Sequence, residues 1–369
     1  MSIKKTAVIL AVLSILLIFL VGCAVEQIQT EQTQQETTKT DELTEQNNTA
    51  EQEPAETEPI AEPKSVLRCN DGTIYSECSA QKPYYCAEGK IIKKATKCGC
   101  PKNYIAENEN CINALEITPE QRTYTYILRG KQDSITATVY KELDAYLSEI
   151  PRTYYCDPEC PTAKELELKY VDNQEQKRHL LEIVKQIKEK TPDTAEQARI
   201  AISFVQSIPY ADGERRRDDL TGRYPYEVLY DQKGVCGEKS SLLAFLLREI
   251  GYGTALFHYV PERHMTAGIK CPLEYSYENT GYCFIETTEP IIATYIPKEY
   301  VEIGALKSEP EIIQINDGNS FDAKEEYKDA RELERINKLG TLLEPIDYAS
   351  WRDLMKKYGI YVRGRLFYK

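Results

Sequence analysis

The stretch KGVCGEKSSLLAFLLREIGY, from Lys233 to Tyr252, decides how the chain is expected to fold. Its apolar residues lie on almost every side of a helix, which predicts a central, buried helix. Gly251 supplies the stop signal of that helix. Cys236 stands at the helix start between Gly234 and Gly237, where the N–H groups and the positive end of the helix dipole stabilise a thiolate. A buried thiol that acts only as a small hydrophobic side chain is the alternative.

The N-terminal end has the pattern of a targeting segment. Lys4 and Lys5 precede an uninterrupted apolar run of 17 residues, from Thr6 to Gly22. Residues 1–23 are therefore expected to be a secretory signal. The end of this segment, LVGC, resembles a lipobox, in which Cys23 is lipid-modified and becomes the mature N-terminus. An uncleaved N-terminal helix anchor is the alternative, because the run approaches the length of a membrane-spanning helix. Both interpretations place the chain on the extracytoplasmic face of the cell membrane.

Residues 24–64 are expected to form a disordered acidic linker. Between Glu26 and Lys64 lie eleven acidic residues and two lysines, among Gln, Thr and Pro, with almost nothing apolar to bury. The segment thus carries nine (eleven minus two) of the thirteen net negative charges, so the acidity says little about what the rest of the chain binds. The sequence has no basic patch, which argues against a nucleic-acid ligand.

The cysteine pattern predicts a small disulfide module at residues 65–113. Six cysteines lie between Cys69 and Cys111, in a stretch with too few aliphatic side chains to build an adequate core. Three disulfides are expected, and fifteen pairings are open. Zinc is the alternative, although the stretch has no CxxC pair and no nearby histidine. The module resembles the Cys-rich beads of surface proteins, which implies adhesion or spacing rather than chemistry.

The remaining cysteines of the folded part are odd in number. In an oxidising compartment at least one thiol must then stay reduced. Cys156 and Cys160 lie four residues apart beside prolines and can form a local bridge. Cys271 and Cys283 can close a loop rich in Tyr, Gly and Asn. Cys236 is left outside the disulfides.

A cysteine nucleophile needs a base, and the chain contains three histidines. His179 lies on the polar side of an amphipathic helix and is expected to be solvated. His258 lies within an apolar strand and is expected to be a core residue. His264 begins a strand over residues 264–270, whose second face carries only small residues and is expected to be open to substrate.

Glu286 is the carboxylate expected to orient His264. It lies in the next strand, residues 282–287, within an apolar run, where a carboxylate is costly to bury without a partner. If the two strands pair antiparallel, its side chain can hydrogen-bond to the imidazole. Cys236, His264 and Glu286 then make a triad by role. Glu289 is the next candidate for the orienting residue.

Strand parity also bears on the last disulfide. Cys271 and Cys283 are expected to point away from the face that carries His264 and Glu286, which supports their pairing with each other. Their bridge and a direct pairing of His264 with Glu286 require different registers. The bridge is therefore expected in the loop beyond the paired strands.

The residues YPYEVLYDQKGVCGEKSSLLAFLLREIGY, followed by HMTAG and FIETTEP, resemble the core of the transglutaminase-like superfamily. The upstream stretch AEQARIAISFVQSIPYADG resembles the helix that precedes this core, so the resemblance covers roughly residues 195–290. It implies an α+β, papain-like fold for residues 114–369, with a central helix packed on an antiparallel sheet, after the disulfide-rich module. Around that core the sequence predicts a hairpin about Gly130 and helices over residues 172–190 and 322–338.

The resemblance also implies roles for the three residues. Cys236 becomes the nucleophile, His264 the base and Glu286 the orienting group, although the family usually has Asp at the last position. Met265 follows the histidine where small and aromatic residues are usual. The backbone N–H of Cys236 is the expected first oxyanion donor. The expected second donor is Gln232, Tyr230 or a tyrosine of RYPY, Tyr224 or Tyr226.

The activity that the resemblance implies is cysteine acyl transfer. The enzyme is expected to act on peptide or carboxamide bonds of protein or peptide substrates at the cell surface through a thioester, with hydrolysis and cross-linking both open. No cofactor and no metal are implied, and the sequence has no EF-hand-type loop that indicates calcium. A catalytically silent binding module and a surface adhesin are the alternative functions.

Overall fold

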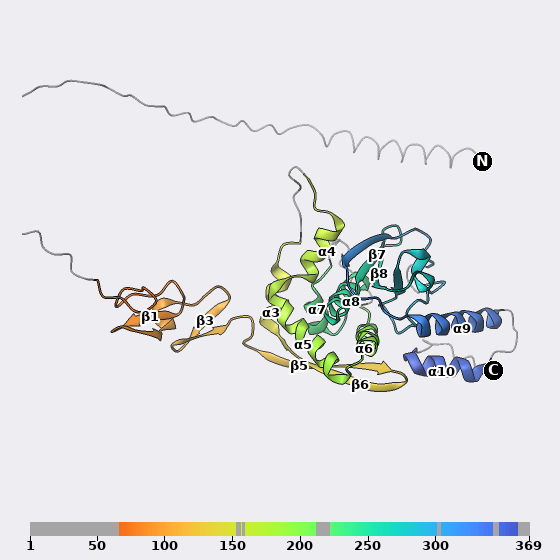
Figure 1. The fold of residues 1–369 in the computed structure, drawn as a ribbon, viewed down its shortest axis with the longest axis horizontal. Helices are drawn as coiled ribbons and strands as arrows, with labels where there is room; N and C mark the ends of the chain where they lie inside the picture. The colour runs from red at the N-terminus through yellow and green to blue at the C-terminus, as the bar shows by residue number, and fades with distance from the viewer. Residues whose placement is uncertain are drawn as a thin grey trace, which may run out of the picture. The chain divides into compact units, whose positions relative to one another are not determined.

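A computed structural model describes residues 66–152, 156, 159–211, 222–300, 304–341 and 347–360. Figure 1 shows small hairpins in the first described part and, after them, helices around an antiparallel sheet. The predicted α+β class with a disulfide-rich N-terminal region is confirmed. The predicted signal and linker, with Cys23, lie outside the described residues, and the predicted domain boundaries stay predictions. Within the described ranges no helix combines the length and the apolar character needed to cross a membrane.

Two antiparallel hairpins form the Cys-rich module. β1 (Tyr84–Ala87) pairs with β2 (Lys90–Lys93), and β3 (Tyr104–Glu107) pairs with β4 (Asn110–Asn113). The short helix α2 (Ala95–Cys98) lies between the two hairpins in the sequence. Strands of four residues bury little apolar surface, so the module needs covalent links.

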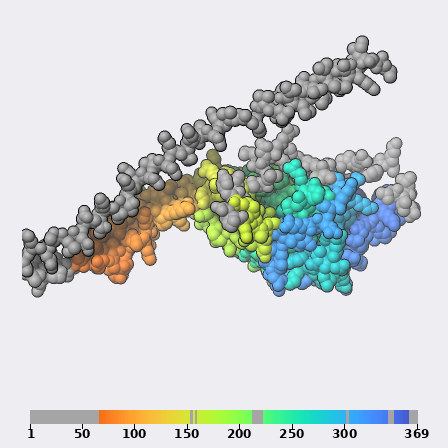
Figure 2. All heavy atoms as spheres, turned by 90° about the horizontal axis from the view of Figure 1, so that it is seen from above, coloured from red at the N-terminus to blue at the C-terminus, as the bar shows by residue number. Residues whose placement is uncertain are grey.

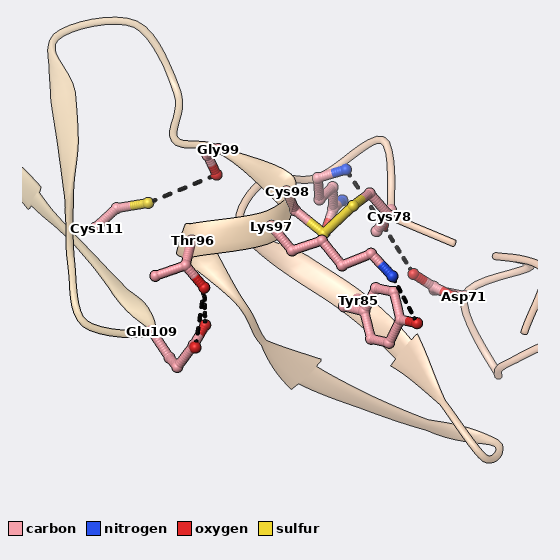
Figure 3. The surroundings of a disulfide bond; sticks show 11 residues. Asp71, Cys78, Tyr85, Thr96, Lys97, Cys98, Gly99, Glu109 and Cys111 are labelled. Atoms are coloured by element: carbon pink, nitrogen blue, oxygen red, sulfur yellow. Dashed lines mark hydrogen bonds between the residues drawn. A yellow bond between two sulfur atoms is a disulfide. The ribbon is translucent and has the colours of Figure 1, made fainter. Parts of the chain in front are cut away.

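Three disulfides cross-link this module, and three of their cysteines, Cys69, Cys86 and Cys98, are buried. Its six cysteines form the bridges Cys69–Cys86, Cys78–Cys98 and Cys100–Cys111. This is one of the fifteen pairings that the sequence left open, and it excludes zinc binding by these thiols. Figure 3 shows the Cys78–Cys98 bridge and, beside it, Lys97 against Tyr85. The Lys97 ammonium lies 4.1 Å from the ring centre and donates a 2.9 Å hydrogen bond to the hydroxyl.

A long hairpin leads into the larger part of the fold. β5 (Pro119–Leu128) pairs with β6 (Lys131–Tyr140) through the turn residues Arg129 and Gly130. Both turn residues have positive φ, 51° and 76°, as a two-residue hairpin turn matched to strand twist requires. The predicted hairpin about Gly130 is confirmed.

The helix predicted from the opening stretch is α8 (Cys236–Ile250). Almost all of its side chains are buried, and Gly251 follows with a φ of 122° and donates to the carbonyls of Leu247 and Arg248. Its apolar surface packs in one core with the helices that surround it. The helices that precede it are α3 (Lys141–Glu149), α4 (Ala163–Val171), α5 (Gln174–Lys190), α6 (Thr194–Ser207) and α7 (Pro225–Asp231).

The sheet that carries the predicted site residues has the strand order β10-β7-β8-β9, and every neighbouring pair is antiparallel. Its strands are β7 (Thr254–Tyr259), β8 (His264–Lys270), β9 (Tyr282–Ile285) and β10 (Glu311–Asn316), and the 3-10 turns η1 (Leu273–Tyr275) and η2 (Tyr277–Asn279) lie between β8 and β9. One face, with Ala267 and Ile285, joins the core around α8.

The second face of β8 is covered, so the expectation that it is open to substrate is wrong. Phe257, Tyr259 and Phe284 form a separate apolar cluster there, with Tyr277 packed against it. A Cβ at Gly268 would lie 2.6 Å from the Phe257 ring. The small residues of β8 therefore make room for aromatic side chains of neighbouring elements and not for substrate.

The register between β8 and β9 accommodates both predicted contacts at once. Ala267 lies opposite Ile285, and Ile269 opposite Cys283. Extended in both directions, this register makes His264 a diagonal neighbour of Glu286 and Cys271 a diagonal neighbour of Cys283. The Cys271–Cys283 bridge forms as predicted. The expected conflict of registers does not arise, because neither pair lies directly opposite in the ladder. The expectation that the bridge lies in the loop beyond the paired strands is wrong for Cys283, which lies within β9.

The remaining elements complete the fold around the core. α9 (Lys324–Thr341) follows β10 and agrees with the helix predicted over residues 322–338, and α10 (Tyr348–Tyr358) comes after it. α4 packs against β10 through Leu168 and Ile313, and Figure 2 shows the yellow-green and blue segments in contact on that side. The predicted local bridge Cys156–Cys160 forms in the segment before α4.

Candidate active site

Cys236 is the first residue of α8, and the ion pair of Glu238 and Arg223 holds the backbone immediately before it. The Glu238 carboxylate accepts a 3.0 Å hydrogen bond from the Val235 N–H, and the Arg223 guanidinium donates to the same carboxylate at 3.1–3.2 Å. The Cys236 side chain is 6% exposed, and its sulfur lies 4.0 Å from the carbonyl oxygen of Arg263. Since Arg263 precedes His264, the sulfur lies beside the start of β8.

His264 and Glu286 meet on the covered face of the sheet. His264 Nε2 lies 3.0 Å from Glu286 Oε2, and the two side chains are 4% and 0% exposed. Glu286 follows β9 directly, at the point where the strand turns. The two groups that the sequence predicted to interact are therefore in hydrogen-bond contact.

The turn after β9 holds the other carboxylate oxygen in place. Glu286 Oε1 accepts hydrogen bonds from the backbone N–H groups of Thr287 at 2.9 Å and Thr288 at 2.8 Å, and from the Thr288 hydroxyl at 2.7 Å. Burial favours the neutral acid, but the hydrogen bond and charge of His264 and the hydrogen bonds from Thr288 hold the pKa of Glu286 below its ordinary value. The carboxylate is ionised and has a fixed direction.

The imidazole lies between this carboxylate and the thiol. Nε2 is engaged by Glu286, so Nδ1 is the ring atom left for Cys236. Burial favours the neutral ring, but hydrogen bonds to Cys236 and Glu286, together with the charges of both groups, raise the pKa of His264 to about 9. The raised pKa favours the imidazolium form of the ring at neutral pH.

A sequence model described as the transglutaminase-like superfamily matches residues 182–282. Residues 182–282 form a transglutaminase-like domain. The matched range contains Cys236 and His264 and ends four residues before Glu286. No curated protein and no solved structure matches the chain.

Tyr300 is a further side chain at the site of this transglutaminase-like domain. Its ring centre lies 4.9 Å from that of His264. Burial and the charge of Glu286 raise the pKa of its hydroxyl, which forms no hydrogen bond of ordinary geometry within the described ranges. Nothing in the sequence indicated this residue, because it lies in a loop 14 positions after Glu286.

The side chains proposed as second oxyanion donors have other partners in the transglutaminase-like domain. The Tyr230 hydroxyl donates to Glu120, and the Gln232 amide donates to the Thr123 carbonyl, both on β5. The Tyr226 hydroxyl pairs with the backbone of Tyr140, and the side chain of Tyr224 is buried. These residues fix α7 against the hairpin.

The other two histidines lie elsewhere in the fold. His179 was expected to be solvated, but its side chain is only 11% exposed and lies between Tyr140 and Tyr226 with ring centres 5.4 Å away. Burial, and then the charge of Arg178, lower the pKa of His179 to about 4. The side chain of His258 is half-buried in β7 rather than a core residue.

Proposed function

We propose that the protein is an extracytoplasmic cysteine acyl-transfer enzyme that acts on peptide or carboxamide bonds through Cys236, His264 and Glu286. The main observation behind this proposal is that the His264 imidazole lies between the Glu286 carboxylate and the Cys236 thiol. The ring has a buried carboxylate 3.0 Å from Nε2 and the thiol at the start of α8 on its other side. A nucleophile, a base and a group that orients the base are what acyl transfer by cysteine requires.

In the first half of the reaction the Cys236 thiolate attacks the carbonyl carbon of the substrate. The negative charge moves to the carbonyl oxygen, where the backbone N–H of Cys236 is the proposed first stabilising donor. As the carbon–nitrogen bond breaks, the nitrogen takes the proton from the His264 imidazolium and leaves as ammonia or an amine. A thioester on Cys236 and a neutral imidazole remain.

In the second half an acceptor attacks the thioester. Water or a primary amine gives up a proton to the neutral His264 and forms the new bond to carbon, and the carbon–sulfur bond breaks to restore the thiolate. Water gives hydrolysis, and an amine gives a cross-link. Glu286 keeps Nε2 protonated in both halves, so that Nδ1 faces the reacting atoms.

The disulfides support an extracytoplasmic location. Five bridges occur in the described part of the chain, and Cys236 is the one cysteine there that forms none. Such a chain belongs in an oxidising compartment. We further propose that it is held to the cell membrane through its N-terminus and meets protein or peptide substrates at the cell surface.

The test is incubation of the full chain with a library of glutamine-containing peptides, with and without a primary amine such as cadaverine. Peptide mass changes distinguish the products: hydrolysis of the carboxamide adds about one mass unit, peptide-bond cleavage yields fragments, and transfer to the amine adds the mass of the amine minus that of the ammonia released. Cys236→Ser is the matched control and should abolish all of them. Reaction by Cys236→Ser at the wild-type rate would overturn the proposal. Peptide binding without any reaction would favour the silent binding module.

A further inference from the structure

Lys239 is a buried cation on the same helix as the proposed nucleophile, three residues after Cys236. Its side chain is 0% exposed. Its ammonium donates to three backbone carbonyls, those of Ile208 at 2.5 Å, Thr288 at 3.1 Å and Gln206 at 3.4 Å. A buried lysine is costly unless its three donors are satisfied. The role assigned to the triad makes no use of it.

The three carbonyls belong to the two segments that hold Glu286. Gln206 lies at the end of α6, and its side-chain amide donates to the backbone carbonyls of Glu286 at 2.8 Å and Ile291 at 3.0 Å. Thr288 donates both its N–H and its hydroxyl to the Glu286 carboxylate. A cation is also favoured at the carbonyl end of a helix such as α6. One ammonium thus fastens both supports of Glu286 to the helix that carries Cys236.

The surroundings leave little freedom for the lysine. A Cβ at Gly234 would lie 3.2 Å from Lys239 Cγ, so the lysine stem packs tightly against the loop that enters α8. Next to it on α8, the Ser240 hydroxyl lies 3.0 Å from that of Thr287 and donates to the Met265 carbonyl at 3.1 Å. Lys239 is the charged residue among these contacts, and its own partners lie at the end of α6 and after β9.

We propose that Lys239 is a positioning residue for the acyl transfer: it fixes the Glu286–Thr288 turn against α8 and thereby sets the distance between the Cys236 sulfur and the His264 imidazole. This inference rests on the proposed function. It assigns Lys239 an action through Glu286 and His264, without contact to the substrate. A lysine that only stabilises the fold would leave the ionisation of the site unchanged.

The test is the rate at which iodoacetamide alkylates Cys236 in the full chain between pH 4 and pH 10, because this rate reports the thiolate and needs no substrate. Lys239→Met keeps the apolar stem and removes the charge and the donors. We expect the inflection of its profile to move up by about one pH unit or more, which makes alkylation roughly tenfold slower below the inflection. If the Met variant does not fold, Lys239→Gln is measured instead, and the same upward shift of the inflection is expected.

The control is Leu246→Ala, a cavity-forming change in the apolar core, seven residues after Lys239 on the same helix, that leaves the buried ammonium and its hydrogen bonds in place. It should lower the melting temperature and leave the inflection at the wild-type pH. Other titratable groups near the pair, Glu286, Tyr300 and Glu238, are unchanged in all these variants. If the wild type has a low inflection and folded Lys239→Met has the same one, the positioning role is overturned and the proposed function is not. An ordinary thiol profile in the wild type would overturn the proposed function itself.

Discussion

Replacement of Glu286 by Gln is the change whose effect on the site follows most closely from the geometry. Three donors from Thr287 and Thr288 converge on Oε1, so the carbonyl oxygen of the glutamine must take that position. Its NH₂ group then faces His264 Nε2. Because an N–H cannot donate to another N–H, Nε2 must lose its proton, and the neutral ring then carries its proton on Nδ1, towards Cys236. In that tautomer the imidazole cannot accept the thiol proton.

The magnitude follows from the pKa of His264. Its rise from 6.5 to about 9 corresponds to roughly 3 kcal/mol in favour of the imidazolium. If Glu286 contributes about half of this, its loss costs on the order of 1 to 2 kcal/mol, or roughly five- to thirtyfold in the population of the ion pair. The wrong tautomer adds to that loss, so we expect turnover to fall on the order of 10²- to 10⁴-fold.

The assay is again alkylation of Cys236 against pH, together with thermal unfolding to show that the fold survives. Glu286→Gln should raise the pH of the inflection and slow alkylation at neutral pH. Glu286→Asp should also lose activity, because a side chain shorter by one methylene cannot span from the Thr288 donors to a ring nitrogen 3.0 Å away. Thr288→Val, which keeps the charge, is the matched control and should be much less damaging. An unchanged profile in folded Glu286→Gln would refute this account of the orienting group.

Four further predictions concern other parts of the molecule. His258→Ala should lower the melting temperature without moving the alkylation profile, because His258 lies half-buried on β7; a shifted profile would implicate it in the site. Joint replacement of Cys271 and Cys283 by Ser should cost about 3 kcal/mol of unfolding free energy in a denaturant titration, with the profile again unchanged. The low pKa of His179 means that the native state resists protonation, so stability should fall as the pH drops from 6.5 towards 4. The loss of unfolding free energy should be below about 3 kcal/mol, because the ring is partly exposed. In urea titrations at several pH values, His179→Gln should make the unfolding free energy less dependent on pH in this range. Mass spectrometry of the N-terminal peptide should show a lipid on Cys23, whereas an intact Met1 would indicate an uncleaved anchor.

Local patterns were sufficient to predict the elements that carry the candidate site. The apolar surface and the glycine stop of α8, and the alternation along β8, predict these two elements closely. Cys236 was selected by its position at a helix start and because it was left outside the predicted disulfides, and Glu286 because a carboxylate is costly to bury in an apolar run. His264 was selected because its strand face was expected to be open, and that face is covered. The pairing of His264 with Glu286 follows from strand parity, and parity also separates them from the Cys271–Cys283 bridge.

What the sequence could not predict depends on contacts between distant segments. The covered face of β8 results from the fit of Phe257 against Gly268, which no periodicity in β8 reveals. The low exposure of the His179 side chain results from the packing of α5 against tyrosines of two other segments. Lys239 could not be singled out from the sequence, because its three carbonyl partners lie more than 30 positions away and no local pattern indicates them.

The central claim is that Cys236 is an activated nucleophile paired with an imidazolium, and alkylation of the wild-type chain tests it most directly. The full chain is treated with iodoacetamide at a series of pH values without reductant, and the labelled peptides are identified by mass spectrometry. The account predicts that Cys236 is labelled, with an inflection well below the value of about 8.5 for an ordinary thiol. Labelling of Cys236 only above about pH 8, or its recovery in a disulfide, would contradict the account.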